Sequence, residues 1–185
     1  MRLTIVRHAE SVANVEKRHS GHTDHELSET GKRQAELIGQ RLESESFDHI
    51  YVSDLTRTRQ TAEPIIARHP NTPITYDSRL REKHLGILEG RLRSEIDADK
   101  WGTVEGGESQ EALTKRIIAF LDEIREKHDE HILIISHGGY ITTLLMHLAG
   151  SDDKETYHPG NASVSIVEFD VEGPTITLVG DQRHL

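Results

Sequence analysis

Two histidines each follow a short apolar segment that has the length of a buried β-strand. His8 comes after Leu3 to Val6 and Arg7, and His137 comes shortly after Ile132 to Ile135. Ligands of open α/β sheets bind beyond the carboxyl ends of the strands, so both histidines are expected at such an edge. A neutral imidazole can attack an electrophile, and a protonated one can stabilise an anion. Taken singly, however, either histidine could be a structural residue held by one hydrogen bond.

Arg57 follows a third predicted strand, Ile50 to Val52, and falls in the first turn of the helix that comes next. If this strand is parallel to the other two, Arg57 lies at the same edge of the sheet. The planar guanidinium suits phosphate oxygens, and a helix N-terminus also favours anions. Arg59 must point elsewhere, because residues two apart on a helix diverge by about 200°. The three segments together indicate an anion site, whereas Arg57 alone could be a surface charge.

The composition excludes several kinds of chemistry. The chain has 185 residues, with 22 lysines and arginines, 32 aspartates and glutamates and no cysteine, so its formal net charge is −10. Without cysteine there is no disulfide framework, thiolate metal site or cysteine nucleophile. The acidic balance lacks the basic footprint of a nucleic-acid-binding domain. No apolar run approaches the roughly 20 residues of a membrane span, so we expect a cytoplasmic protein with no nucleic acid and no membrane as partner.

The apolar pattern alternates between strand and helix periods along the chain. Strands are expected at Leu3 to Val6, Ile50 to Val52, Ile74 to Tyr76, Ile132 to Ile135, Val164 to Phe169 and Thr175 to Val179. Helices are expected at Ser28 to Leu42, Thr56 to His69, where Pro64 could introduce a kink, Ser109 to Lys127, and Tyr140 to Leu148, which ends at Gly150. This order predicts an α/β fold, a three-layer α/β/α sandwich with a mostly parallel central sheet and an antiparallel edge hairpin. We expect a single domain, 1–185, in which the aperiodic segment 83–107 is a short cap.

Three closely spaced histidines suggest a competing interpretation, a metal site. His19, His22 and His25 are three residues apart, and on a helix or turn they could present ligands to zinc. However, Gly21 lies among them, the segment has the composition of a loop, and no cluster of aspartate or glutamate supports a two-metal site. We therefore expect no metal and no other cofactor.

Arg7 and His8 begin a motif, continued by Ala9, Glu10 and Ser11, that resembles the signature of the histidine phosphatase superfamily in its phosphoglycerate mutase-like branch. That signature is arginine, histidine, glycine and glutamate followed by threonine or serine. Other segments resemble the motifs of the family in the same order: Gly21 to Asp24, Leu27 to Gly31, Ser53 to Ala62, Leu80 to Glu82, Glu89 to Gly90, Gly106 to Ser109, Ser136 to Gly139 and Asn161 to Ser163. The resemblance covers nearly the whole chain.

The resemblance implies a phosphohistidine mechanism in which His8 is the nucleophile. Glu82 would protonate the leaving alkoxide and then activate water, although in isolation it could form a loop salt bridge. Arg7, Arg57 and His137 would surround the phosphoryl oxygens, with His137 as a cation. A group that the sequence does not identify would orient His8 through its other ring nitrogen. Contacts with the phosphate or the leaving group are expected from Asn14, Gly21, His22, Thr23 and Gly138.

Hydrolysis and mutase chemistry share the phosphohistidine and differ in what accepts the phosphoryl group. The cofactor-dependent mutases that this chain resembles carry an insertion with substrate-binding basic residues after the acid-bearing loop, and here only 25 residues, Lys83 to Gly107, span that interval. We expect a metal-independent phosphatase of small phosphorylated metabolites, acting as a monomer or homodimer. Alternatives are phosphoglycerate mutase-type transfer, a protein phosphatase with an open site, and a module that senses a phosphorylated ligand without turnover.

Overall fold

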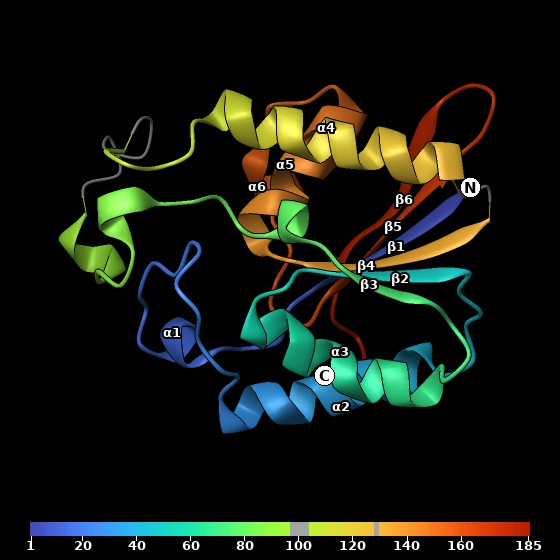
Figure 1. Cartoon of the computed structure of the whole chain (residues 1–185), viewed down its shortest axis with the longest axis horizontal. Coiled ribbons are helices and arrows are strands. Elements are labelled where there is room, and N and C mark those ends of the chain that lie inside the picture. The colour runs from blue at the N-terminus through green and yellow to red at the C-terminus, as the bar shows by residue number, and fades with distance from the viewer. Residues whose placement is uncertain (97–103, 128–129) are drawn as a thin grey trace.

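A six-stranded mixed sheet runs through the part of the protein that the structure describes (Figure 1). The computed structural model describes residues 1–96, 104–127 and 130–185. In chain order the strands are β1 (Arg2–Arg7), β2 (His49–Val52), β3 (Ile74–Tyr76), β4 (His131–Ser136), β5 (Val164–Phe169) and β6 (Pro174–Asp181). Their order across the sheet is β3-β2-β4-β1-β5-β6. The first four of these are parallel, whereas β5 is antiparallel to β1 and β6 to β5, which confirms the predicted edge hairpin.

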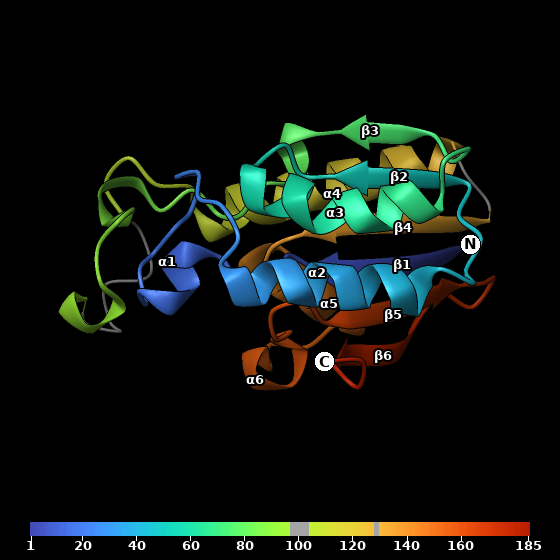
Figure 2. The same cartoon turned by 90° about the horizontal axis from the view of Figure 1, so that it is seen from below.

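Helices cover both faces of the sheet and give the predicted three layers (Figure 1, Figure 2). One face carries α2 (Glu29–Leu42) and α3 (Thr56–Arg68), and the other carries α4 (Gln110–Lys127) and α5 (Gly138–Ala149). Two single-turn helices, α1 (Val12–Val15) and α6 (Lys154–Tyr157), were not predicted. Across the described ranges, no helix combines the length and the apolar character needed to cross a membrane.

The two central strands are apolar between their end residues, apart from Thr4, because both of their faces are buried. Along β1, Leu3 and Ile5 belong to the core cluster that includes residues of α4 and α5, whereas Val6 belongs to the cluster with residues of α2 and α3. Along β4, Ile134 and Ile135 divide between the two clusters in the same way. Parallel strands that are buried on both faces have this continuous apolar sequence. The core therefore fixes the two strands that lead into the candidate site.

Helix ends agree with the sequence except at the start of α5. Ser28 caps α2, because its hydroxyl accepts a hydrogen bond from the backbone N–H of Gly31 (3.0 Å). The cap of α5 at its other end is Gly150, which adopts the left-handed conformation (φ 59°) as predicted. At its start, however, α5 begins at Gly138, two residues before the predicted Tyr140. Its first turn is therefore built on the glycine pair.

The segment after β3 contains the predicted cap and lies beside the loop that follows α1. Between β3 and residue 96 its described residues are irregular apart from 3₁₀ turns at Ser78–Leu80, Gly86–Leu88 and Arg93–Glu95. The backbone N–H of Gly90 donates to the carbonyl of His19 (2.7 Å), and the N–H of His19 donates to the carbonyl of Arg91 (2.9 Å). Residues 97–103 of this cap lie outside the described residues. The division of the chain into one domain, 1–185, with a cap at 83–107 stays a prediction.

Candidate functional site

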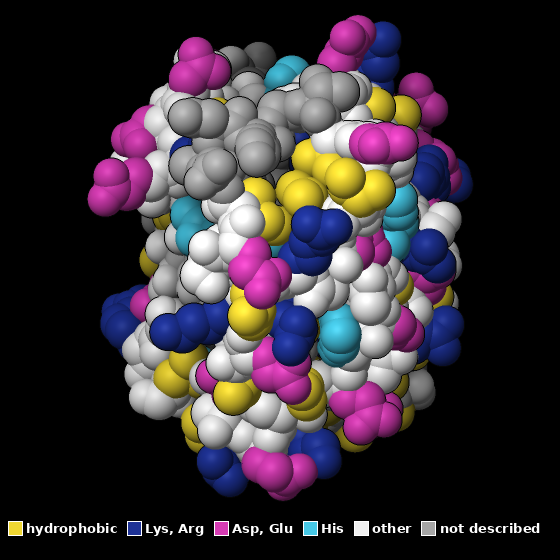
Figure 3. Space-filling model, turned by 90° about the vertical axis from the view of Figure 1, so that its left-hand side faces the viewer, with side chains coloured by type: hydrophobic (Ala, Val, Ile, Leu, Met, Phe, Trp, Pro, Cys, Tyr) yellow, Lys and Arg dark blue, Asp and Glu magenta, His cyan; other side chains and the backbone are white. Residues whose placement is uncertain are grey.

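A cavity of about 1290 Å³ lies at the carboxyl ends of β1, β2 and β4. Figure 3 views this end of the molecule, where basic, acidic, histidine and hydrophobic side chains are interspersed. Of the predicted site residues, those that line the cavity are Arg7, His8, Asn14, Gly21, Arg57, Glu82 and Gly138. His22, Thr23 and His137 are not among its described lining residues. The edge of the sheet thus brings together side chains that are far apart in the sequence.

The imidazole of His8 is buried and held in one tautomer. Its Nδ1 lies 2.7 Å from the carbonyl oxygen of Ala9, and because a carbonyl only accepts, Nδ1 carries the proton and Nε2 keeps its lone pair. Burial, and then the charges of Arg57 and Arg7, hold the pKa of His8 well below its ordinary value. The ring is therefore neutral at pH 7, as a nucleophile requires. The orienting group that the sequence left unidentified is the carbonyl of Ala9.

Arg7 is a buried cation with an unused donor. Its Nη1 donates to the carbonyl of Pro159 (2.6 Å), whereas its buried Nε has no hydrogen-bond partner among the described residues. Burial lowers the pKa of Arg7 to about 10, so the guanidinium stays charged at neutral pH. A buried donor without a partner costs about 1–3 kcal/mol, which an anionic ligand could recover. Gly138 permits this position, because a Cβ on it would lie only 3.1 Å from Cζ of Arg7.

Arg57 uses each of its nitrogens to hold another part of the site. Its Nη2 donates to the carbonyl of Gly21 (2.8 Å) and its Nη1 to the carbonyl of Thr23 (3.0 Å). Its Nε donates to Nδ1 of His137 (3.2 Å). The side chain is 1% exposed, and its burial lowers its pKa. Arg57 therefore links the loop after α1 to the end of β4, in addition to lining the cavity.

The structure does not hold His137 as the cation that was expected. Its Nδ1 accepts the hydrogen bond from Arg57 and so carries no proton, and its Nε2 lies 2.8 Å from the hydroxyl of Ser53. Burial, followed by the charges of Arg57, His8 and Arg7, keeps its pKa well below the ordinary value. The sequence could not show this, because the donor at Nδ1 comes from another helix. The rings of His137 and His8 are nevertheless neighbours, with centroids 5.2 Å apart.

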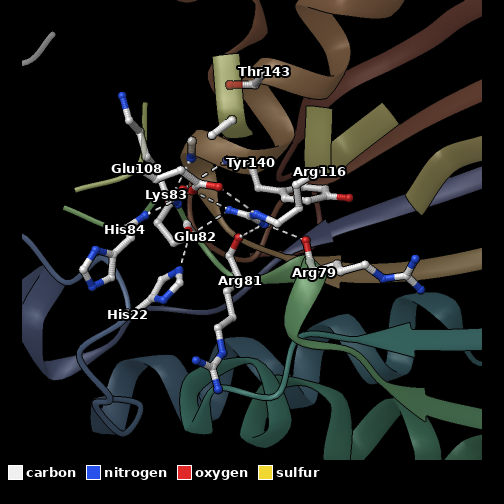
Figure 4. Close-up of polar contacts among 12 residues, drawn as sticks. His22, Arg79, Arg81, Glu82, Lys83, His84, Glu108, Arg116, Tyr140 and Thr143 are labelled. Atoms are coloured by element: carbon white, nitrogen blue, oxygen red, sulfur yellow. Dashed lines mark hydrogen bonds and ion pairs between the residues drawn. The ribbon is translucent and has the colours of Figure 1, made fainter. Parts of the chain in front are cut away.

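The carboxylate of Glu82 lies at the N-terminus of α5 (Figure 4). Its Oε2 accepts from the backbone N–H of Gly139 (2.9 Å), and its Oε1 accepts from the N–H groups of Tyr140 (3.1 Å) and Lys83 (2.9 Å). A helix N-terminus favours negative charge, so this position suits a carboxylate. A Cβ on Gly139 would lie 2.5 Å from Oε1 of Glu82. The two glycines therefore admit Arg7 and Glu82 to the same helix end.

Two residues that the sequence did not assign hold the segment around Glu82 (Figure 4). Arg116 on α4 donates through Nη1 to the carbonyls of Arg79 (2.6 Å) and Arg81 (2.9 Å). The carboxylate of Glu108 accepts from Nε (2.9 Å) and Nη2 (2.7 Å) of Arg116. Glu108 was visible only as part of a glycine-glutamate motif, and no local pattern pairs it with an arginine on the next helix.

His22 and Thr23, which were predicted to contact the ligand, bind other parts of the protein and are not among the described residues that line the cavity. The backbone N–H groups of both residues donate to the carboxylate of Glu89, each at 2.8 Å. His22 also places its Nε2 2.8 Å from the carbonyl of Glu82. Their neighbours Ser20 and Gly21 line the cavity instead. The backbone amides of His22 and Thr23 are therefore bound by Glu89, and a role for these two residues at the ligand stays a prediction.

The histidine-rich loop does not gather its histidines into one ligand set. Within the described residues, no group of three or more histidine, cysteine, aspartate or glutamate residues could hold a metal ion. His19 is buried and His25 is half-buried, while His22 contacts the acid-bearing segment. Asn14 lines the cavity, and its Oδ1 accepts from the backbone N–H of Ser11 (3.0 Å).

The depressed pKa of His8 predicts a pH-dependent stability. Above about pH 6.5 the imidazole is neutral in both the folded and the unfolded chain. Below it only the unfolded chain is protonated, so the free energy of unfolding should fall by up to about 1.4 kcal/mol per pH unit for this residue. Urea unfolding between about pH 7.5 and pH 5 should show a shallower slope for His8→Gln than for the wild type. An unchanged slope in His8→Gln would contradict the depressed pKa of His8.

Nearly the whole chain is similar to known proteins. Residues 3–182 match the family model of the histidine phosphatase superfamily (branch 1). The probable phosphoglycerate mutase GpmB of Photorhabdus laumondii is 36% identical over 205 residues, which cover 100% of this chain and 95% of that protein. The structure of Bacillus stearothermophilus YhfR is similar with a TM-score of 0.91 and 29% identity, covering 99% of this chain and 98% of that one. The mycobacterial glucosyl-3-phosphoglycerate phosphatase in complex with VO3 has a TM-score of 0.88 and 28% identity, covering 98% and 99%. The chain therefore belongs to branch 1 of the histidine phosphatase superfamily.

Proposed function

We propose that this protein is a metal-independent phosphatase that hydrolyses small phosphomonoesters through a phosphohistidine on His8. One observation carries the proposal. His8 is neutral, with its Nδ1 proton fixed by Ala9 and its Nε2 lone pair available at a cavity lined by Arg7 and Arg57. A neutral imidazole between two guanidinium groups is suited to attack a phosphoryl group, because the cations hold the oxygens while the lone pair approaches phosphorus.

In the first step, Nε2 of His8 would form a bond to phosphorus as the bond from phosphorus to the ester oxygen breaks. The guanidinium of Arg7 would stabilise the equatorial oxygens, and its unsatisfied Nε gives it a donor for this purpose. Glu82, which lines the same cavity, would enter this step as the carboxylic acid and become a carboxylate as it gives its proton to the leaving alkoxide. The products of this step are the free alcohol, phosphohistidine and the carboxylate of Glu82.

In the second step, the carboxylate of Glu82 would take a proton from water as the water oxygen attacks phosphorus. The bond between phosphorus and Nε2 breaks, which releases inorganic phosphate and restores neutral His8 and protonated Glu82. The backbone N–H groups of Gly139 and Tyr140 stabilise the charged carboxylate between the two steps. A single carboxyl group therefore serves both half-reactions, as acid and then as base.

His137 supports this mechanism through Arg57. Because Nδ1 of His137 accepts from Nε of Arg57, the imidazole fixes the rotation of the guanidinium. A direct contact between His137 and the phosphoryl oxygens, which the family resemblance implies, would require one of its bonds to Arg57 or Ser53 to open. Asn14, Gly21 and Gly138 would complete the wall around the phosphate.

The cavity extends beyond the reaction centre toward α4, α5 and α6. This outer part is lined by polar and apolar side chains, among them Gln110, Thr114, Thr143, Met146 and His158. Ligand pockets of metabolites and drug-sized molecules are usually about 300–1,000 Å³, so the space suits a whole small molecule. The mycobacterial relative is a glucosyl-3-phosphoglycerate phosphatase, which supports hydrolysis of a small phosphorylated metabolite.

We propose a cytoplasmic protein that is a monomer or homodimer.

A mutase is the second candidate, because the relative from Photorhabdus laumondii is a probable phosphoglycerate mutase. The two activities separate in one experiment. Phosphate release is measured with glycerol 3-phosphate, 3-phosphoglycerate, a nucleoside monophosphate and p-nitrophenyl phosphate, with His8→Ala as the blank. The 3-phosphoglycerate arm is repeated with a bisphosphorylated cofactor, and formation of the 2-isomer is followed. Phosphate release that is absent from the variant supports the phosphatase, whereas isomer formation without phosphate release supports the mutase.

Chelators should leave the activity unchanged. The proposed mechanism stabilises the phosphoryl oxygens with guanidinium groups, and no step needs a metal ion. The measurement is the rate of p-nitrophenyl phosphate hydrolysis after dialysis against EDTA, compared with an untreated sample. A loss of activity that zinc or magnesium restores would overturn the metal-independent mechanism and return His19, His22 and His25 to consideration as ligands.

A further inference from the structure

The carboxylate of Glu89 is enclosed by hydrogen-bond donors from two segments of the chain. Its Oε1 accepts from the backbone N–H groups of His22 (2.8 Å) and Leu85 (3.0 Å). Its Oε2 accepts from the N–H and the hydroxyl of Thr23, both at 2.8 Å. The side chain is 13% exposed and is not among the described residues that line the cavity. The carboxylate of Glu89 therefore binds other groups of the protein and is not placed to bind a substrate.

The surroundings of Glu89 are built for an ionised carboxylate. Burial by itself raises the pKa of this carboxyl, but the hydrogen bonds from His22, Leu85 and Thr23 outweigh it and leave the pKa below the ordinary value. Gly21 has a positive φ of 50°, and a Cβ on it would collide with the carboxylate of Glu89. Only glycine therefore lets the loop close around this group.

The loop that Glu89 holds is the same loop that Arg57 holds from the other side. Glu89 binds the N–H groups of His22 and Thr23, whereas Arg57 binds the carbonyls of Gly21 (2.8 Å) and Thr23 (3.0 Å). The backbone of these three residues is thus fixed between an anion and a cation. The charge of Glu89 also acts on Arg57 directly, because it is one of the charges that oppose the lowering of the Arg57 pKa by burial.

We propose that Glu89 is a positioning residue for the phosphoryl site, acting through the loop from Gly21 to Thr23 on the guanidinium of Arg57. This inference rests on the proposed function, because it assigns Arg57 to the phosphoryl oxygens. Arg57 has a long side chain, and its carbonyl partners are on a loop rather than on a strand or helix. Without Glu89 the loop that carries the two carbonyls loses the anion that holds its N–H groups. The guanidinium of Arg57 is then no longer held in one position by these carbonyls.

Replacing Glu89 by glutamine tests this role with little change in volume. The glutamine amide has one acceptor oxygen, whereas both oxygens of the carboxylate accept hydrogen bonds. Its NH2 group therefore faces N–H or hydroxyl donors and cannot accept from them. The affinity for orthovanadate, measured by titration calorimetry, should fall by about tenfold or more, since two or more hydrogen bonds to a charged group are lost. Glu16→Gln is the matched control, because Glu16 is a carboxylate on the neighbouring segment that binds, among the described residues, the side chain of Arg18 (2.6 Å). It should bind vanadate as the wild type does.

A double-mutant cycle separates positioning from a general loosening of the loop. Arg57→Lys keeps the charge but removes the planar group that binds the two carbonyls. If Glu89 acts through Arg57, Glu89→Gln should weaken vanadate binding about tenfold in the wild type and less than about twofold in the Arg57→Lys background. Equal weakening in both backgrounds, or none in the wild type, overturns the inference.

A milder variant and a separate readout complete the test. Thr23→Val removes only the hydroxyl bond to Glu89 and should shift vanadate affinity in the same direction by about two- to threefold. This variant keeps the test decisive if Glu89→Gln does not fold, which circular dichroism and thermal unfolding will show; unchanged affinity in Thr23→Val would then count against the inference. Failure of the proposed function would appear differently, as a wild-type protein that neither releases phosphate nor binds vanadate.

Discussion

Replacing His8 with alanine should lower the rate of phosphate release by on the order of 10⁴-fold or more, because the variant has no atom that can accept the phosphoryl group. The loss should affect every substrate to a similar extent, whatever its leaving group, since the nucleophile is common to all of them. The measurement is phosphate release at saturating substrate, together with labelling from a ³²P-labelled substrate after quenching in alkaline detergent, in which phosphohistidine is stable. The wild type should retain acid-labile label on the protein, and His8→Ala should retain none.

The control for His8→Ala is a histidine that takes no part in the site. His25 is half-buried and is not among the described residues that line the cavity, so His25→Ala should keep wild-type activity and labelling. Thermal unfolding of His8→Ala establishes that the variant is folded, because the substitution removes the bond from Nδ1 to the carbonyl of Ala9. Retention of most of the activity in a folded His8→Ala would exclude His8 as the nucleophile.

Glu82→Gln should slow the reaction by an amount that depends on the leaving group. An alkoxide leaves poorly without a proton, so hydrolysis of glycerol 3-phosphate should fall by about 10²–10⁴-fold. A p-nitrophenolate ion leaves without protonation, so the first turnover of p-nitrophenyl phosphate should stay fast. Its later turnovers should be slow, because water attacks phosphohistidine without a general base. Rapid-mixing measurements should therefore show a burst of p-nitrophenolate in this variant.

The burst distinguishes the two roles of Glu82 from a simple structural role. Glu82 accepts hydrogen bonds from Gly139 and Tyr140 at the start of α5, so its replacement also changes a helix end. Damage to that helix alone would slow both substrates equally and would give no burst. The exposed Glu111→Gln, which removes a carboxylate from the first turn of α4, should leave both substrates unaffected. Equal slowing of the two substrates in Glu82→Gln would argue against its role as the acid.

The sequence predicted the sheet and the edge of the site because these depend on burial along the chain. β1 and β4 are apolar on both faces, so their position and length could be recognised from consecutive residues. The polar residues that follow them fall at the same edge because the strands are parallel. The helix α5 was predicted to start too late, because two glycines normally end regular structure. Here they begin a helix, since they make room for Arg7 and Glu82.

The states of individual side chains could not be predicted because they depend on contacts between distant segments. His137 was expected to be a cation from its place near the phosphate. It is neutral because Nε of Arg57, which lies 80 positions away in the sequence, donates to its Nδ1. His22 and Thr23 were expected at the ligand from the position of their loop, but Glu89 binds their amides from 66 and 67 positions away. No periodicity or local motif contains this information.

The place of β1 in the sheet has a consequence for how the protein is made. β1 is the first strand in chain order, yet its neighbours are β4, where Arg2 pairs with His131, and β5, where Arg2 pairs with Glu168. During synthesis on the ribosome, more than a hundred further residues must therefore be added after β1 before its partner strands β4 and β5 are available for pairing. Pairings between such distant strands are slow to form and leave apolar edges exposed meanwhile. His8 should therefore gain its final surroundings only after β4 and β5 have been synthesised.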